Sequence, residues 1–438
     1  MLRRLNRNYR NYRLGKDLVG TCGRILMAIG SVSVLFSQVQ AAPGDYDFTF
    51  GFLGVKIDHV DNKKMYPSEL AQQADGKLLM VGRLGGGLIT TNRVLLRRYN
   101  SNGSVDLGFG LSGFGVAQIY PSIVSIYGDA RAVAVQTDGK ILVSGVVPIS
   151  TTATKPVVWR FTTLGELDTS FGDEGQVSIG RLATGYPVGI AFSGGRILTI
   201  VQLSPGRWVL TRLNADGTTD TLFGDAGYAD IDLDSSSAFV VNPTNRNIVI
   251  GGTIFNIAGT PTPALEQFDR NGNPDQSFGV AGVAIPDLAT PACPNAQPSF
   301  VSSIGLQTDG RIIVGGRHEV PLYNDPSNNS NYIVRLGLDG ALDTGFGTTG
   351  FATKCNSRTY EPILIVSRTT NQIVAVLGLP VDGTNATSFR RYSAGGLLNL
   401  VFPASRATDL LIQTADDKVV TVEWATPTGD VRLARFLQ

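Results

Sequence analysis

The feature that most constrains this chain is a pair of short motifs that recurs seven times after residue 45. The first is a turn motif such as Asp138-Gly139-Lys140, and the second is a Phe-Gly dipeptide such as Phe171-Gly172. The turn motif or a degraded form of it occurs at 75–77, 138–140, 194–196, 245–247, 309–311, 371–372 and 416–418. The dipeptide occurs at 50–51, 109–110, 171–172, 223–224, 278–279 and 346–347, with a Phe-Pro form at 402–403. This periodicity indicates one supersecondary unit present in seven copies.

The unit is clearest between residues 132 and 172. Two short apolar stretches, 133–135 and 141–145, flank Asp138-Gly139, and an Asp-Gly pair supplies the positive φ that a tight hairpin turn requires. Two more stretches, 157–161 and 167–171, flank a turn at 164–165. The unit therefore predicts four antiparallel strands, the last of which ends at the Phe-Gly dipeptide.

Seven such units predict an all-β fold, a seven-bladed β-propeller of four-stranded antiparallel blades. One sheet cannot bury both of its faces alone, and packing sheets around an axis solves this problem with few free edges. The last unit has only three predicted strands, whereas residues 44–51 read as a fourth strand with none before it. We therefore expect the N-terminal strand to complete the last blade and close the ring, which leaves no unpaired edges there.

An arginine precedes an aspartate by eight residues in several units. Positions at this separation about a short turn face each other across a hairpin, where opposite charges attract. The pairs are Arg98 and Asp106, Arg160 and Asp168, Arg212 and Asp220, and Arg335 and Asp343. By the same logic, Arg435 of the last unit is expected to pair with Asp47. Because the pair recurs along the chain, we interpret it as structural rather than catalytic.

The N-terminus is typical of a secretory signal. Residues 1–24 carry seven basic side chains and one acid, an apolar run follows at 25–36, and Val39 and Ala41 are the small residues of a cleavage site. We expect residues 1–41 to be removed and residues 42–438 to form a single propeller domain with no membrane span. An uncleaved anchor is the alternative, although the run is shorter than the roughly 20 residues that span a bilayer. The expected location is secreted, periplasmic or on the cell surface.

The mature chain would keep two cysteines, Cys293 and Cys355. Each lies between a Phe-Gly dipeptide and the first strand of the following unit. An even pair in an exported protein is typical of a disulfide, and two free thiols are the alternative.

The whole pattern resembles the bacterial delta-60 repeat. The resemblance rests on Val135-Gln136-Thr137-Asp138-Gly139-Lys140-Ile141, the following Arg160-Phe161, and Leu167-Asp168-Thr169-Ser170-Phe171-Gly172. It covers residues 45–438, and the second and fifth units match best. The resemblance implies an exported bacterial β-propeller, and it implies no activity and no catalytic residues.

Composition and motifs give little support for catalysis. The net charge of +1 disfavours a general nucleic-acid-binding surface. The two histidines, His59 and His318, have no metal-ligand spacing and are expected in solvated loops. The chain has no serine-nucleophile motif and no phosphate-binding glycine loop. The sequence therefore favours a protein without catalytic residues, metal or cofactor.

The variable loops are where binding is expected. The longest, 317–331, carries Tyr323 and Asp325; its oxygen-rich run makes calcium an alternative, although it lacks the spaced carboxylates of a known calcium loop. The segments that join one unit to the next should rim the central channel on the opposite face. Candidate binding residues there are Tyr120, Tyr127, Tyr186 and Tyr360, with packing as the alternative role.

Three function classes remain open. The favoured one is an exported, non-catalytic binding module that engages a protein or glycan through its loops. The second is a lactonase-like hydrolase or lyase with a metal in the central channel, which requires acids or histidines that converge on the axis. Three or more carboxylates within reach of one ion would favour this class. Charged residues at the starts of the inner strands are Glu69, Asp129, Arg131, Glu361 and Asp409. The third is a structural component of an envelope assembly.

Overall fold

The computed structural model describes one compact unit within residues 42–438. The described ranges are 42–60, 64–85, 93–110, 128–150, 152–180, 184–204, 206–257, 259–288, 297–319, 330–354, 362–377, 387–405, 407–425 and 430–437. Every regular element among them is a β-strand. None of these residues belongs to a helix that is long and apolar enough to span a membrane.

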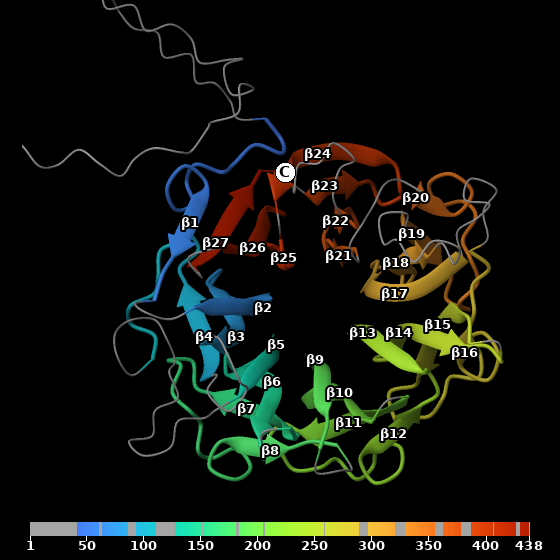
Figure 1. Ribbon diagram of the computed structural model, residues 1–438, viewed down its shortest axis with the longest axis horizontal. Coiled ribbons are helices and arrows are strands. Elements are labelled where there is room, and N and C mark those ends of the chain that lie inside the picture. Colours follow the sequence, from blue (N-terminus) through green and yellow to red (C-terminus); the bar gives the residue numbers. More distant parts are fainter. Residues whose placement is uncertain are drawn as a thin grey trace, which may run out of the picture. The chain divides into compact units, whose positions relative to one another are not determined.

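The strands form seven antiparallel sheets arranged around a central axis (Figure 1). Blade 1 contains β2 (Met65–Gln72), β3 (Leu78–Leu84) and β4 (Arg93–Tyr99). Blade 2 contains β5 (Asp129–Val135), β6 (Ile141–Pro148), β7 (Thr154–Phe161) and β8 (Gln176–Ser178), and blade 3 contains β9 (Tyr186–Ser193), β10 (Arg196–Ser204), β11 (Arg207–Asn214) and β12 (Tyr228–Ile231). Blade 4 contains β13 (Ser235–Val241), β14 (Ile248–Phe255), β15 (Pro261–Phe268) and β16 (Val283–Ala284). The ring is therefore built in chain order.

The remaining blades follow the same plan. Blade 5 contains β17 (Gln297–Leu306), β18 (Ile312–Glu319), β19 (Ser330–Leu336) and β20 (Phe351–Lys354), and blade 6 contains β21 (Ile363–Val366), β22 (Ile373–Leu377), β23 (Thr387–Tyr392) and β24 (Leu398–Ser405). Blade 7 contains β25 (Asp409–Ile412), β26 (Val419–Ala425), β27 (Asp430–Phe436) and, on its outer edge, β1 (Val55–Asp58). The inner strands β2, β5, β9, β13, β17, β21 and β25 contact one another in that order, and β25 contacts β2. The predicted seven-bladed propeller is confirmed.

The N-terminal segment closes the ring, as the sequence predicts. Strand β1 pairs with β27 in the register Val55↔Ala434, and Tyr46 forms a further bridge with Phe436. The last blade therefore takes its outer strand from the other end of the chain, which leaves β27 with a partner on both sides.

The predicted position of the fourth strand is wrong in blade 2, whereas in blade 6 the outer strand β24 includes Phe402 as predicted. Residues 167–171 do not form a strand: Leu167 makes one bridge to Phe161, and the chain then turns. The Asp168 carboxylate folds this segment, because its Oδ1 accepts hydrogen bonds from the Ser170 amide at 3.2 Å and from the Ser170 hydroxyl at 2.6 Å. The outer strand of blade 2 is β8, which follows the Phe-Gly dipeptide, and β1 likewise follows Phe50-Gly51. In blade 1, the equivalent place falls in residues 111–127, outside the described residues.

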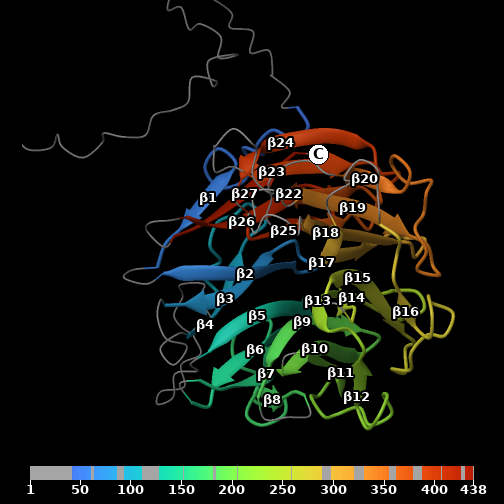
Figure 2. The same cartoon turned by 45° about the vertical axis from the view of Figure 1, so that its right-hand side comes forward.

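The hydrophobic core lies between the blades. Seven clusters of buried apolar side chains each combine residues from two neighbouring sheets, so that one cluster fills each junction of the ring. Between blades 1 and 2, for example, Val81 packs with Val133 and Trp159. Figure 2 shows these sheets side by side with their faces toward one another. Because each sheet buries both faces only in the ring, closure contributes directly to stability.

In blades 1, 2, 3, 5 and 7 the recurring motifs join the blade to the next one through what we call the clamp. In blade 2, Arg160 Nε lies 2.8 Å from Asp168 Oδ2, and Arg160 Nη1 donates to the Ala215 carbonyl of blade 3 at 2.6 Å. The guanidinium carbon lies 4.6 Å from the centre of the Phe171 ring, which is itself fully buried. A β-carbon on Gly217 of blade 3 would lie 2.8 Å from that ring, so only glycine fits there. Equivalent Arg–Asp pairs at 2.8 or 2.9 Å are Arg98–Asp106, Arg212–Asp220, Arg335–Asp343 and Arg435–Asp47.

The last of these clamps joins the two ends of the chain. Asp47 and Arg435 are 3% and 7% exposed, and Lys418 Nζ lies 3.0 Å from the same carboxylate. Arg435 also donates to the Ser101 carbonyl of blade 1 at 2.5 Å. Burial alone would raise the pKa of Asp47, but hydrogen bonds from Thr49 and Lys418 and the charge of Arg435 outweigh it and lower the pKa to about 2.

The two sets of loops share one face, which corrects the expectation that they lie on opposite faces. The start of β2 pairs with the end of β3, as Met65↔Leu84 shows. In an antiparallel blade, the loop between the second and third strands therefore lies beside the segment that enters the first strand. We call this the loop face, and the opposite side, which carries the short turns such as 136–140, the turn face.

Candidate functional site

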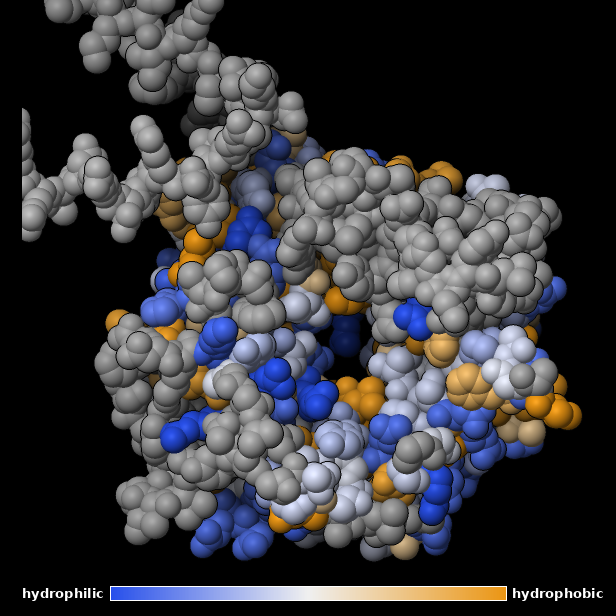
Figure 3. All heavy atoms as spheres, viewed as in Figure 1, coloured by the Kyte–Doolittle hydropathy of each residue, from blue (hydrophilic) through white to orange (hydrophobic). Residues whose placement is uncertain are grey.

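The central hollow and its opening on the loop face form the candidate site. Figure 3 shows a hollow at the centre of the ring, with mostly polar side chains around it and a few apolar ones. The inner strands line it, and five of them are bulged within the first half of the strand, for example between Pro67 and Glu69 and between Ala130 and Ala132. A bulge re-aims the extra residue, and Ser68 and Arg131, the bulged residues here, are both exposed.

Two carboxyl groups near the bulges join neighbouring inner strands. Asp409 Oδ2 of blade 7 accepts from the Leu70 amide of blade 1 at 2.7 Å, and Glu69 Oε2 of blade 1 accepts from the Val133 amide of blade 2 at 2.7 Å. Each acid thus hydrogen-bonds the strand of the next blade. Blades 4 and 5 use hydroxyls instead, since Ser237 Oγ donates to the Val301 carbonyl at 2.6 Å.

Burial raises the pKa of both acids. Burial, followed by the negative charge of Asp409, raises the pKa of Glu69 well above its usual range. Burial raises the pKa of Asp409 to about 7, although hydrogen bonds from the Leu70 and Leu410 amides act against the rise. A carboxyl group whose pKa lies near 7, as that of Asp409 does, can both donate and accept a proton under physiological conditions.

No three metal-ligating side chains (His, Cys, Asp or Glu) gather to hold an ion within the part of the chain that the structure describes. Glu361, one of the acids noted in the sequence, lies outside the described residues. The trio of carboxylates that a channel metal requires is therefore not found among the described side chains.

Tyrosine and arginine side chains gather at the channel opening, and we call them, with Asp129, the mouth cluster. The Arg83 guanidinium carbon lies 4.5 Å from the centre of the Tyr66 ring, and its Nη1 lies 3.7 Å from Asp129 Oδ2. Arg131 lies 5.8 Å from the centre of the Tyr186 ring. Blades 1, 2 and 3 each contribute, because Tyr66, Asp129 and Tyr186 begin or nearly begin their inner strands.

One polar atom of the mouth cluster lacks a partner. Arg83 Nε is buried and makes no hydrogen bond with any described group. Tyr186 is 42% exposed and Arg131 is also exposed, so two of the five side chains are accessible to a ligand from solvent. Exposed tyrosine and arginine side chains are enriched at the energetic centres of interfaces.

Most of the binding residues expected from the sequence cannot be placed. Tyr120, Tyr127, Tyr323, Asp325 and Tyr360 lie outside the described residues, as do Cys293 and Cys355. Tyr186 lies at the channel opening. Tyr66 and Arg83 were missed; the signal that could have found them is their position at the strand ends of the face that carries the long loops.

The histidines have structural surroundings. His59 follows β1, is exposed, and its Nδ1 lies 2.5 Å from Asp430 Oδ1, so it adds a contact to the ring closure. His318 belongs to β18 and pairs with Pro298, which corrects its expected loop position, because β18 extends to Glu319.

Comparison with known proteins supports the fold. Residues 73–109, 136–171, 195–223, 245–278 and 307–346 match the model of a family described as a domain of unknown function (DUF5122) beta-propeller. Each match ends at the phenylalanine of a Phe-Gly dipeptide. No curated protein matches the chain.

Many solved propellers are similar in fold. Polysaccharide lyase Uly1 is 13% identical, with a TM-score of 0.50 over 92% of this chain and 94% of that one. A catalytically inactive virginiamycin B lyase from Staphylococcus aureus, solved with quinupristin, is 11% identical, with a TM-score of 0.47 over 88% and 99%. Sqt1 from Chaetomium thermophilum is 12% identical, with a TM-score of 0.45 over 84% and 82%. At these identities the likeness concerns the fold alone. The five segments that match the family model lie in blades 1 to 5 of the ring.

Proposed function

We propose that the protein is an exported binding module that engages a protein or glycan ligand at the channel opening on the loop face. The observation that carries the proposal is the mouth cluster, in which arginines lie against tyrosine rings and one buried guanidinium nitrogen has no hydrogen-bond partner among the described groups. Such a surface offers flat apolar rings together with hydrogen-bond donors, which suits a ligand that is neither purely apolar nor purely charged.

The position of the cluster supports the same function. The strand ends from which the variable loops leave lie on the same face as the cluster. The turn face, by contrast, is occupied by the clamps that hold the blades together. Binding on the loop face therefore leaves the stabilising contacts of the ring undisturbed.

The test is capture of a ligand by the immobilised protein from an envelope fraction and from a panel of purified polysaccharides. Arg131→Ala and Tyr186→Ala each remove one exposed member of the mouth cluster and should reduce capture at least about tenfold, as expected for central interface residues. Glu166→Ala changes an exposed residue of the turn face and should capture as the wild type does. Equal capture by all three variants would contradict a binding site at the mouth.

A channel enzyme of the hydrolase or lyase class is a second candidate, because Glu69 and Asp409 are carboxyl groups on inner strands whose pKa values are raised by burial. A general acid requires a pKa near the working pH. If this function holds, the wild type should turn over a lactone or a polysaccharide from a substrate panel. Glu69→Gln and Asp409→Asn should lose that turnover while keeping the wild-type unfolding midpoint. Absence of turnover by the wild type on both classes would count against it.

A further inference from the structure

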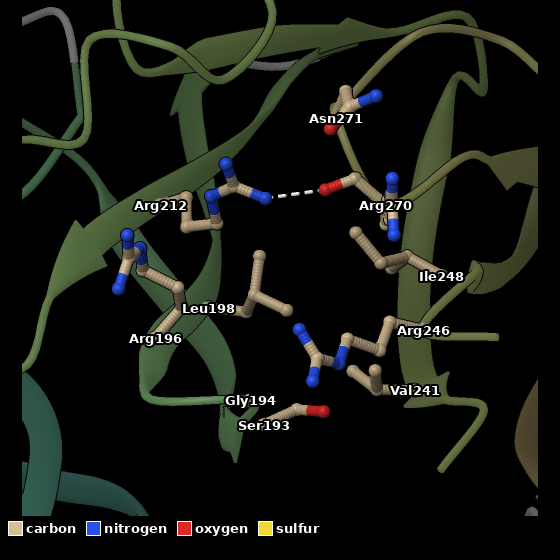
Figure 4. A pocket seen from close by; sticks show the side chains of 10 residues that line it. All are labelled: Ser193, Gly194, Arg196, Leu198, Arg212, Val241, Arg246, Ile248, Arg270 and Asn271. Atoms are coloured by element: carbon tan, nitrogen blue, oxygen red, sulfur yellow. Dashed lines mark hydrogen bonds between the residues drawn. The ribbon is translucent and has the colours of Figure 1, made fainter. Parts of the chain in front are cut away.

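A pocket of about 230 Å³ lies on the turn face between blades 3 and 4, away from the mouth cluster. Four arginines line it, and we call it the arginine pocket. Arg196 and Arg212 come from β10 and β11 of blade 3, and Arg246 and Arg270 come from the two turns of blade 4. Figure 4 shows their guanidinium groups arranged around the side chain of Leu198.

The pocket holds more positive than negative charge. Arg196 and Arg212 share one carboxylate, with their Nε atoms 2.7 and 2.9 Å from Asp220 Oδ2. For Arg246 and Arg270, no carboxylate of the described chain lies within 4.0 Å of the guanidinium groups. Burial, together with the nearby charge of Arg196, lowers the pKa of Arg212 even though Asp220 acts in the opposite direction.

Asp269, an acid beside the pocket, accepts its hydrogen bonds from residues of its own turn. The Asp269 carboxylate accepts from the Asn271 amide at 2.8 Å, from the Asn273 amide at 2.9 Å and from the Asn273 side chain at 3.0 Å. These bonds lower the pKa of Asp269 against the effect of burial and hold it in the adjoining hollow. Two guanidinium groups therefore remain without a charged partner.

The fold does not require an arginine at position 246. Arg246 has φ +64°, a left-handed conformation that costs an ordinary L-residue roughly 1–2 kcal/mol. The positive-φ residue of the same turn is glycine in other blades, namely Gly76, Gly139 and Gly310, or is Asn371 or Asp417, which adopt this conformation more readily. Blade 4 thus keeps a strained arginine where an unstrained residue would fold as well.

The fold does not require the Arg270 side chain either. Its carbonyl, rather than its guanidinium, accepts the clamp hydrogen bond from Arg212. The residues whose carbonyls play this part in other clamps are Ser101, Thr163, Ala215 and Ala394. A small side chain therefore serves the clamp, and the arginine is surplus to it.

We propose that the arginine pocket binds a doubly charged oxyanion, either inorganic phosphate or sulfate or the phosphate group of a small ligand. Guanidinium groups match the geometry of such oxyanions and donate paired, charge-assisted hydrogen bonds. Arg246 and Arg270 have no carboxylate to release, so their full charge is offered to the ligand. This site is separate from the proposed ligand surface on the loop face.

Calorimetric titration with sodium phosphate, sodium sulfate and glucose 6-phosphate tests the proposal, with glucose as the uncharged control. All three anions should bind and glucose should not. Tighter binding of glucose 6-phosphate than of inorganic phosphate would assign the pocket to a phosphate monoester. Tighter binding of inorganic phosphate would assign it to the free anion. Arg246→Gly and Arg270→Ala should each weaken binding about tenfold or more, since one charge-assisted hydrogen bond contributes at least that factor.

The variants are chosen from residues that other blades carry at the same places, so the fold should persist, and Arg246→Gly should not lower the unfolding midpoint. Arg207→Ala, at the exposed opposite end of β11, removes the same charge far from the pocket and should leave affinity unchanged. The proposal is overturned if the wild type binds none of the anions, if Arg246→Gly binds as tightly as the wild type, or if Arg207→Ala weakens binding equally.

Discussion

Replacing Asp47 with asparagine tests whether the closing clamp holds the ring together. The change keeps the shape of the side chain and removes its charge from a site where it lies 2.8 Å from Arg435 and 3.0 Å from Lys418. Both partners of the Asp47–Arg435 pair are almost fully buried. Asparagine would leave the buried Arg435 guanidinium without its carboxylate, and removal of one partner from a buried ion pair costs about 3–5 kcal/mol.

The pKa of Asp47 gives a second magnitude. It falls from 3.8 to about 2 on folding, and each pKa unit corresponds to about 1.4 kcal/mol, so ionisation of Asp47 contributes about 2.5 kcal/mol at neutral pH. Because the pKa is lower in the folded state, this contribution is complete above about pH 5 and is lost as the pH falls toward 2. Asp47→Asn should therefore be less stable than the wild type by about 2–5 kcal/mol at pH 7, and the difference should shrink under acid.

Urea denaturation of both proteins at several pH values measures this difference. Asp416→Asn is the matched control, because Asp416 contacts the same Lys418 at 2.8 Å but is 41% exposed, and exposed pairs contribute only about 0–1 kcal/mol. A cost for Asp47→Asn no larger than that of Asp416→Asn, or a difference from wild type that is independent of pH, would refute the reasoning.

Two further predictions concern buried groups away from the closure. Burial raises the pKa of Glu266, which accepts a hydrogen bond from the Asp232 amide at 2.9 Å, to about 8, so the wild type loses stability as the pH rises from about 4.5 to 8. Over that range the free energy of unfolding of Glu266→Gln, measured by denaturation, should rise relative to that of the wild type, by ~3 kcal/mol at most at pH 7. Parallel pH profiles of the two proteins would argue against this. Gly165 and Gly206 both have positive φ, but a β-carbon would lie 2.7 Å from the Phe109 ring only at Gly165. Gly165→Ala should therefore lower the thermal midpoint more than Gly206→Ala, whereas equal losses would mean that backbone strain alone matters.

Most of the architecture could be predicted because it depends on local pattern. The Asp-Gly turns and the eight-residue Arg–Asp spacing act within one hairpin, so the number of blades and the first three strands of each follow from short stretches of sequence. The outer strand was misplaced because Leu167 to Phe171 alternates like a strand. The Asp168 carboxylate instead accepts hydrogen bonds from the amide and the hydroxyl of Ser170 and so forms a turn. The serine two residues after the aspartate was the sequence signal for that turn.

The candidate sites could be predicted less well, because they combine residues from different blades. Arg83 meets Asp129 across a blade junction, and no spacing in the sequence encodes that contact. The arginine pocket likewise joins Arg212 to Arg270 of the next blade. The only sign of it in the sequence was Asn245-Arg246-Asn247 at the place where other units have Asp-Gly-Lys. From the sequence alone this difference looks like a degraded copy of the turn motif, and only the structure shows that Arg246 lines a pocket.

The most direct test of the central claim is a cross-link between the two ends of the chain. Val55 and Ala434 face each other across β1 and β27, so Val55→Cys combined with Ala434→Cys should form a disulfide under mild oxidation, seen by peptide mass mapping, and should raise the urea midpoint. Val55→Cys with Val431→Cys, which is out of register, should not cross-link. If the matched pair stays reduced while a Thr421→Cys and Ala434→Cys pair within β26 and β27 oxidises, the N-terminal segment does not close this ring.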